Sequence, residues 1–184
     1  MTFKKTSAKN DRFLEQSIRN IPDFPKPGIL FRDVTTLIKN KAAFKKSVDL
    51  LAKKYKNMKI DKVVGVEARG FIFGAALAHK IGAGFVPVRK KGKLPHKTIS
   101  ATYQLEYGTD TLEIHKDALT PGEKILIIDD LLATGGTAMA AIDLIKQLGG
   151  TIKGIGFVIE LVGLGGKDKL KGYPVYSLVK FEGE

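Results

Sequence analysis

Apolar and polar residues follow one another along the chain in blocks that predict strands and helices in turn. Short runs of β-branched and other apolar residues are typical of strands buried on both faces. Longer segments whose apolar residues recur every three or four positions predict helices. The expected strands are Val63–Val66, Phe85–Val88, Ile125–Ile128, Ile152–Ile159 and Val175–Val179, with a shorter extended run at Leu112–Ile114. The expected helices are Asp11–Asn20, Lys41–Lys56, a segment from the Glu67–Gly70 turn through Ile81, and Ala138–Leu148.

The connections between these elements carry prolines, glycines and polar residues. Ile21–Gly28 contains three prolines, which hold φ and remove backbone donors, so regular structure is not expected there. Lys93–Tyr107 is mostly polar and too long for a simple connection, which predicts a lid or binding loop. Gly163–Lys169 is predicted to be a flexible turn.

Strands that alternate with helices predict an α/β fold with a mainly parallel twisted sheet flanked by helices. The 184 residues suit a single domain, 1–184, in which residues 1–10 form a basic extension. No internal repeat, low-complexity tract or linker divides the chain. Ligands of such sheets bind beyond the carboxyl ends of the strands. Residues that follow Val66, Val88 and Ile128 are therefore expected to converge on one edge.

Composition narrows the class of protein. The chain is 43% hydrophobic and 27% charged, as in ordinary globular proteins, and it has no cysteine, so disulfides and thiolate metal sites are excluded. The amino terminus has no apolar core typical of a signal peptide, and the apolar-rich run Gly70–Ala78 is too short to span a bilayer. These features predict a cytoplasmic protein with no membrane partner.

The net charge of +12 comes from 31 Lys and Arg against 19 Asp and Glu. A field of that sign attracts nucleic acids and also small polyanions. Most of the lysines are spread along the chain without interleaved aromatic residues or a nucleic-acid module, so a solvated surface is expected rather than a nucleic-acid partner. One cluster, Arg89–Lys93, stands apart at the end of a predicted strand.

The segment Ile125–Thr137 contains the most specific chemistry in the chain. A buried strand leads into Asp129 and Asp130, then into Ala133-Thr134-Gly135-Gly136-Thr137, and then into a helix. Glycines let backbone amides approach a ligand, and a helix N-terminus favours a phosphate dianion. Two adjacent carboxylates can accept hydrogen bonds from the vicinal hydroxyls of a ribose. The alternative is an acidic pair that only ends a strand, but the full order of residues favours a sugar-phosphate site.

Three further groups allow both a structural and a functional interpretation. Arg69 follows a strand, where its guanidinium could bind a pyrophosphate or form a surface ion pair with Glu67. Phe24 and Phe31 could belong to the core or form a wall for a flat ring. The three histidines are scattered without the spacing of metal ligands.

The chain resembles a known family. Ile125–Thr137 is similar to the 5-phosphoribosyl-1-diphosphate (PRPP) motif of the type I phosphoribosyltransferases, and the resemblance is closest to the adenine-specific members. It extends from Ile21 to Phe181. The matching stretches are residues 21–33, 65–74, 89–95, 103–108 and 125–137. The resemblance implies the type I phosphoribosyltransferase fold with a small hood and a flexible catalytic loop, acting in a homodimer.

The resemblance also implies a reaction and a set of roles. Adenine displaces pyrophosphate from PRPP to give AMP in purine salvage, and Mg²⁺ arrives on the pyrophosphate, with no metal ligand expected from the chain itself. The implied PRPP residues are Ala133, Thr134, Gly135, Gly136 and Thr137 for the 5′-phosphate, Asp129 and Asp130 for the ribose hydroxyls, and Arg69 and Lys93 for pyrophosphate, Lys93 reaching a partner subunit's site. Leu30, Phe31 and Arg32 would wall the base, while Glu106 would act as acid and base at purine N7 with Tyr107 beside it in the lid.

Two rival functions use the same fold. A PRPP-sensing regulator that binds nucleic acid would suit the charge, but no helix-turn-helix or other module precedes the domain, and Glu106 in a lid would have no purpose in a protein that only binds. The structural alternative for Glu106 is a solvated surface residue. A transferase for a 6-oxopurine would keep the PRPP site and change the base site. Without the resemblance, the residues themselves indicate only a transferase that uses PRPP.

Overall fold

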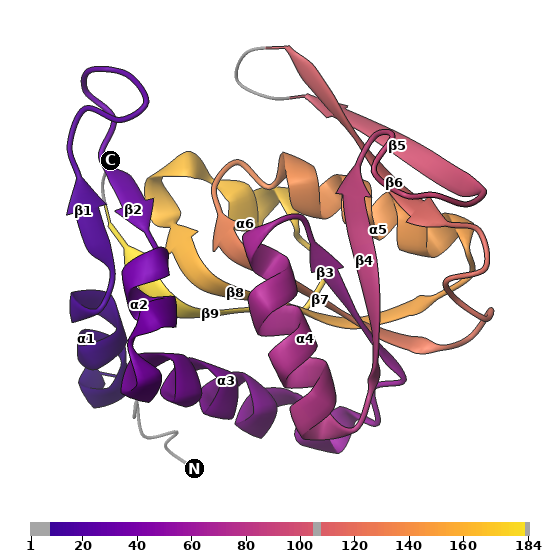
Figure 1. Cartoon of the computed structure of the whole chain (residues 1–184), viewed down its shortest axis with the longest axis horizontal. Coiled ribbons are helices and arrows are strands. Elements are labelled where there is room, and N and C mark those ends of the chain that lie inside the picture. The colour runs from indigo at the N-terminus through magenta and orange to yellow at the C-terminus, as the bar shows by residue number, and fades with distance from the viewer. Residues whose placement is uncertain (1–7, 105–107, 183–184) are drawn as a thin grey trace.

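The computed structural model, which describes residues 8–104 and 108–182, is organised around a seven-stranded sheet (Figure 1). The strand order is β5-β6-β4-β3-β7-β8-β9. The strands are β3 (Lys62–Val66), β4 (Gly84–Lys90), β5 (Thr98–Gln104), β6 (Thr109–His115), β7 (Lys124–Leu132), β8 (Thr151–Leu161) and β9 (Val175–Phe181). The five strands β4, β3, β7, β8 and β9 pair parallel with one another. At one edge β6 pairs antiparallel with both β4 and β5. The predicted mainly parallel α/β sheet is confirmed.

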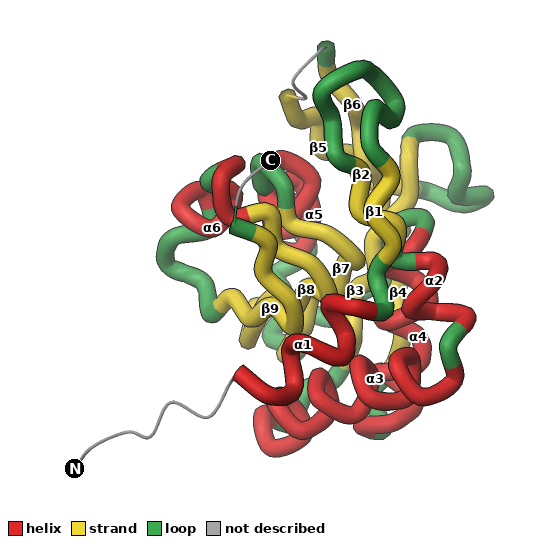
Figure 2. The backbone as a smooth tube through the Cα atoms, turned by 90° about the vertical axis from the view of Figure 1, so that its left-hand side faces the viewer, coloured by secondary structure: helices red, strands yellow, loops and turns green. Residues whose placement is uncertain are grey.

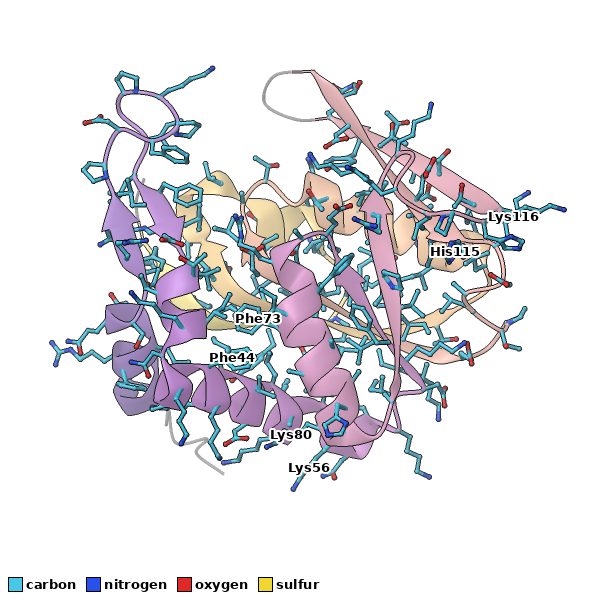
Figure 3. All side chains as sticks on the ribbon, in the orientation of Figure 1. Phe44, Lys56, Phe73, Lys80, His115 and Lys116 are labelled. Carbon is cyan, nitrogen blue, oxygen red and sulfur yellow. The ribbon has the colours of Figure 1, made fainter. Side chains whose placement is uncertain are left out.

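Helices cover both faces of the sheet (Figure 2). They are α1 (Ala8–Gln16), α2 (Thr35–Lys39), α3 (Lys41–Tyr55), α4 (Arg69–Ile81), α5 (Gly136–Gln147) and α6 (Gly166–Lys169), with 3-10 turns at Lys56–Met58 and Val162–Leu164. Two apolar cores result, because α5 packs on one face and α1, α3 and α4 pack on the other. Phe44 of α3 and Phe73 of α4 point toward each other with ring centroids 5.7 Å apart (Figure 3). No helix in the described ranges is long and apolar enough to cross a membrane.

A small hairpin projects from the amino-terminal part of the chain. Its strands β1 (Arg19–Ile21) and β2 (Phe31–Asp33) pair antiparallel around the proline-rich loop, which has no regular structure, as predicted. The predicted helix Asp11–Asn20 was wrong at its end, because α1 stops at Gln16 and Arg19 already belongs to β1. Asp33 fastens the hairpin by accepting hydrogen bonds from the Arg19 guanidinium and from the Thr35 amide and hydroxyl.

A second projection is the two-stranded arm formed by β5 and β6, which rises on the same side of the sheet as the hairpin (Figure 1). The prediction of an irregular lid across Lys93–Tyr107 was wrong for Thr98–Gln104, because these residues form β5 and pair with β6. Glu106 and Tyr107 fall outside the described residues. The predicted turn at Gly163–Lys169 is also wrong in part, because it contains a 3-10 turn and α6.

Candidate active site

A cavity of about 420 Å³ opens at the carboxyl ends of β3, β4 and β7. Its wall includes Arg69 from the start of α4, Lys90 from the end of β4, and the continuous segment Asp129–Ala138. Three segments that are far apart in the sequence therefore meet at the edge where a parallel sheet binds ligands. Of the predicted site residues, Arg69, Asp129, Asp130 and the five residues from Ala133 to Thr137 line this single cavity.

The loop from Ala133 to Thr137 is held in a compact form by glycines. Gly135 has a φ of 80° and precedes α5, whose first residue is Gly136. A side chain cannot be added at either position, because an added Cβ would lie 2.9 Å from the Gly166 carbonyl oxygen at Gly135 and 2.9 Å from the Gln104 carbonyl oxygen at Gly136. The first amides of α5 thus face the cavity without side-chain capping. Such amides, with the helix dipole, form a site for an anion.

The acidic pair ends the buried strand β7. Asp129 and Asp130 are 9% and 7% exposed, and Asp129 Oδ1 accepts a hydrogen bond of 2.8 Å from the Asp130 amide. Burial raises the pKa of Asp129 well above its usual range, and the nearby Asp130 carboxylate raises it further. Gly70 permits this close packing, since a Cβ there would lie 2.8 Å from Asp129 Oδ1. The strand therefore delivers two buried carboxylates to one cavity.

Arg69 forms an ion pair with the Asp130 carboxylate through its Nε atom. The alternative of a surface pair with Glu67 was wrong, because Glu67 instead binds the Arg89 guanidinium at 2.9 Å, which lowers the pKa of the Glu67 carboxyl. The side chain of Arg69 remains 46% exposed at the cavity wall. Its guanidinium carbon also lies 5.9 Å from the centre of the Phe31 ring, so Arg69 lies beside both the cavity and the hairpin.

The hairpin residues that are expected to contact the purine base lie outside the wall of the cavity. Leu30, Phe31 and Arg32 are half-buried, and Phe31 packs edge-on against Phe24 with centroids 5.2 Å apart. Phe24 is 50% exposed, so the alternative in which Phe24 lies in the core was wrong. The Arg32 guanidinium points away, donating to the Asn20 side chain at 2.6 Å and stacking over Phe181 at 3.9 Å. The side chain of Arg32 thereby stabilises the hairpin, while its backbone forms part of β2.

Sequence reasoning missed several residues of the cavity wall. Lys90 was named only as part of a basic cluster, whereas the predicted Lys93 is exposed and does not line the cavity. Tyr103 reaches the wall from β5, and Phe157 reaches it from β8. The alternation of apolar Ile99, Ala101 and Tyr103 with polar neighbours was a signal for a half-buried strand that would have placed Tyr103 inside.

The described residues provide no preformed metal site of their own. They contain no group of three or more histidine, aspartate or glutamate side chains arranged to hold an ion. Two of the carboxylates at the cavity are paired with cations, Glu67 with Arg89 and Asp130 with Arg69. A divalent ion that enters bound to substrate phosphate oxygens fits such a wall, since Mg²⁺ commonly binds through phosphates, water and only one or two carboxylates.

Comparison with known proteins identifies the family. Residues 33–177 match the phosphoribosyl transferase domain. An adenine phosphoribosyltransferase of Rhizobium leguminosarum is 56% identical over 172 residues, covering 92% of this chain and 95% of that protein. A crystal structure of the enzyme of the same name from Thermoanaerobacter pseudethanolicus is 53% identical, with a TM-score of 0.89 over 92% of this chain and 99% of that one. The chain belongs to the adenine phosphoribosyltransferase family.

A third relative relates this family to ligands. The adenine phosphoribosyltransferase of Saccharomyces cerevisiae, 43% identical with a TM-score of 0.88, covers 92% of this chain and 98% of its own, and was solved with an imino-altritol bisphosphate and adenine. As a member of the adenine phosphoribosyltransferase family, the chain is a phosphoribosyl-transferring enzyme with the type I phosphoribosyltransferase fold.

Proposed function

We propose that this protein transfers the 5-phosphoribosyl group of PRPP to adenine, releasing pyrophosphate and forming AMP in purine salvage. The observation that carries the proposal is the single cavity in which the Asp129–Thr137 segment and Arg69 meet, in a chain more than half identical to adenine phosphoribosyltransferases over most of its length. In the reaction the bond from ribose C1 to pyrophosphate breaks, a bond from C1 to adenine N9 forms, and the N9 proton leaves.

The 5′-phosphate of PRPP occupies the loop of residues 133–137. Backbone amides of Ala133, Thr134, Gly135, Gly136 and Thr137 and the two threonine hydroxyls act as its donors, and the start of α5 adds a partial positive charge. This arrangement needs no lysine from the loop. The tight backbone packing at Gly135 and Gly136 supports the assignment, because it holds these donors in one geometry before the ligand arrives.

The ribose lies over the acidic pair. Asp129 and Asp130 accept hydrogen bonds from the two ring hydroxyls, which holds C1 in line with the leaving group. Substitution at this carbon passes through an oxocarbenium-like state, as in glycoside hydrolysis. Carboxylates fixed nearby stabilise the positive charge as it develops. Their burial strengthens this effect, because little water screens them.

Pyrophosphate binding requires Arg69 to exchange partners. In this structure the Arg69 guanidinium is paired with Asp130, and a pyrophosphate offers a stronger bidentate partner. The exchange frees Asp130 for the ribose hydroxyls, so ribose and pyrophosphate binding support one another. Lys90 adds a second cation from the cavity wall. Mg²⁺ carried on the pyrophosphate supplies further charge neutralisation for the leaving group.

Lys93 acts in a homodimer by reaching the pyrophosphate of the partner subunit's site. Its exposed position, off the wall of its own cavity, supports this role. The absence of cysteine from the chain fits a reducing compartment, so we propose a cytoplasmic enzyme.

Adenine binds between the cavity and the hairpin. Phe31 stacks on the purine, Leu30 covers its side, and the backbone of Arg32 pairs with the base edge. The position of Phe31 beside Arg69 supports this placement, because it joins the hairpin to the pyrophosphate region. A backbone carbonyl that faces the 6-position accepts from an amino group and is left unpaired by a 6-oxo group. Such an unpaired buried acceptor gives discrimination on the order of 10⁴-fold in favourable cases.

Glu106 completes the chemistry as acid and base at purine N7, with Tyr107 beside it. A carboxylate at N7 assists the loss of the N9 proton through the ring system. A closing lid shields C1 from water and prevents hydrolysis of PRPP. Replacing Glu106 with Gln is expected to lower kcat far more than it weakens PRPP binding. Equal losses in kcat and PRPP affinity would refute the assignment.

The experiment that tests the function measures pyrophosphate release from PRPP and Mg²⁺ with each free base supplied in turn. Turnover with adenine alone is expected. Turnover with a 6-oxopurine would retain the PRPP assignments but overturn those for Leu30, Phe31 and Arg32. Tight PRPP binding without turnover on any base would instead support a PRPP-sensing regulator.

A further inference from the structure

Asp110 on β6 lies outside the cavity wall but contacts two residues that form it. Its Oδ2 atom is 3.0 Å from Lys90 Nζ and accepts a hydrogen bond of 3.4 Å from the Tyr103 hydroxyl. Its Oδ1 atom accepts from the Thr111 amide at 2.8 Å, which fixes the orientation of the carboxylate. Tyr103 and Asp110 are also direct partners in the pairing of β5 with β6. One carboxylate thus links β4 to the arm.

The contacts continue from Tyr103 to residues 133–137, the proposed phosphate loop. Burial raises the pKa of the Tyr103 hydroxyl, and the nearby Thr137 side chain partly offsets that rise. The ring packs so closely on the loop that a Cβ added to Gly136 would lie 3.2 Å from Tyr103 Cδ2. A chain of contacts therefore runs from Lys90 through Asp110 and Tyr103 to Thr137. Its two ends lie at the regions assigned above to pyrophosphate and to the 5′-phosphate.

The charges along this chain have opposite consequences for substrate binding. The Lys90 side chain is flexible and 60% exposed, so it could adopt many conformations. The ion pair with the Asp110 carboxylate favours one of these conformations. Asp110, only 23% exposed, is also an anion close to a site for polyanions. It competes with pyrophosphate for Lys90 and repels the phosphates of PRPP. The carboxylate thus weakens ground-state binding while it orders the wall and the arm.

We propose that Asp110 is a positioning residue for the transferase reaction, which holds Lys90 at the cavity and ties the arm to the phosphate loop through Tyr103. The proposal rests on the function proposed above. Asp110 touches no reacting atom. It acts through Lys90, which lines the cavity and would meet the leaving group, and through Tyr103, which joins the arm to the loop of residues 133–137.

The decisive variant is Asp110→Asn, which keeps the size of the side chain and removes its charge. The KM for PRPP is expected to fall about two- to fivefold, because the competitor for Lys90 is gone and an exposed charge pair contributes about that much. The kcat is expected to fall about tenfold, because the arm and Lys90 lose their fixed geometry. A merely structural residue would lower kcat and stability together and leave the KM for PRPP unchanged.

Three variants complete the experiment. Asp110→Glu keeps the charge and is expected to restore much of kcat and to return the KM for PRPP toward the wild-type value. Tyr103→Phe removes one of the two links and is expected to lower kcat, with less than additive loss when combined with Asp110→Asn. Asp117→Asn removes an exposed carboxylate just beyond the same strand and serves as the matched control, with wild-type kinetics expected.

Calorimetric titration of each variant with PRPP and Mg²⁺ alone separates this proposal from the proposed function. Tighter PRPP binding by Asp110→Asn than by wild type supports the proposal whether or not adenine is turned over. Unchanged or weaker PRPP binding overturns it, as does an unchanged kcat in an active enzyme. Inactivity of the wild type with adenine would refute the proposed function and the predicted loss of kcat, while the titration would still decide the electrostatic part.

Discussion

Gly166 supports the phosphate loop from outside the cavity, and its replacement by alanine tests this support. It is the first residue of α6, and its added Cβ would lie 2.1 Å from the Ala133 carbonyl oxygen. Ordinary contact begins at 3.4 Å, so one backbone must move by about 1.3 Å, the difference between the two distances. The approach is mutual, because Gly135 meets the Gly166 carbonyl in the same way. Two backbones therefore touch where neither tolerates a side chain.

The size of the effect follows from this displacement. Overpacking of this kind costs about 1–3 kcal/mol of folding free energy, which lowers the melting temperature by about 2–4 °C for each kcal/mol in a chain of this length. Ala133 is an assigned phosphate ligand, and misplacement of such a group by about 1 Å can reduce activity about 100-fold. We expect Gly166→Ala to lower kcat/KM for PRPP by that order while the protein remains folded.

Steady-state kinetics with varied PRPP, together with thermal unfolding, checks this expectation. Gly163→Ala is the matched control, since it lies in the same segment, has no atom within 4 Å of the added Cβ and carries no positive φ. Its activity should equal that of the wild type. A Gly166→Ala enzyme with wild-type kcat/KM for PRPP would show that α6 does not set the geometry of the loop. An equal loss of kcat/KM in Gly163→Ala would show that the effect comes from the segment as a whole and not from the contact of Gly166.

Three other predictions concern the acidic pair and the hairpin. Asp129→Asn should raise the melting temperature at pH 8, because burial makes the ionised Asp129 costly to the fold whereas Asp130 is paired with a cation. The same variant should lose most of its turnover. A lower melting temperature would contradict this expectation. Hydrogen bonds from the Thr35 hydroxyl and from Arg19 lower the pKa of Asp33 from 3.8 to about 2. The ionised Asp33 therefore contributes about 2 kcal/mol to the free energy of unfolding, which is complete above about pH 4 and is lost as the pH falls toward 2. The difference in melting temperature between wild type and Asp33→Asn should shrink over that window, and a constant difference would refute the linkage. Phe31→Ala should raise the KM for adenine by about tenfold, the loss of one base–aromatic stack, and leave the KM for PRPP near wild type, and equal rises in both would remove Phe31 from the base site.

The local pattern of the chain was enough to predict the central sheet and the glycine loop that leads from β7 into α5. Buried parallel strands such as β7 are continuous apolar runs, and a strand, an acidic pair and a glycine-rich helix start form a contiguous unit whose chemistry lies in neighbouring residues. The convergence of Arg69 with Asp129 also followed from the sequence, because the carboxyl ends of parallel strands meet at one edge. These features depend on short-range order in the chain, which the sequence records directly.

Other features depended on contacts between distant segments. The polar arm strand β5 was mistaken for a loop because its partner β6 and its packing on α5, which hold it extended, appear only in three dimensions. Arg69 faced two possible carboxylates, and the tertiary structure paired it with Asp130, 61 residues away, while Arg89 took Glu67. The sequence by itself determined which chemical groups this protein carries and at which end of the sheet they emerge. Only the tertiary structure decided which charges are paired, which glycines bear the closest backbone contacts and which residues line the cavity, because each of these depends on distances between atoms that the order of residues leaves open.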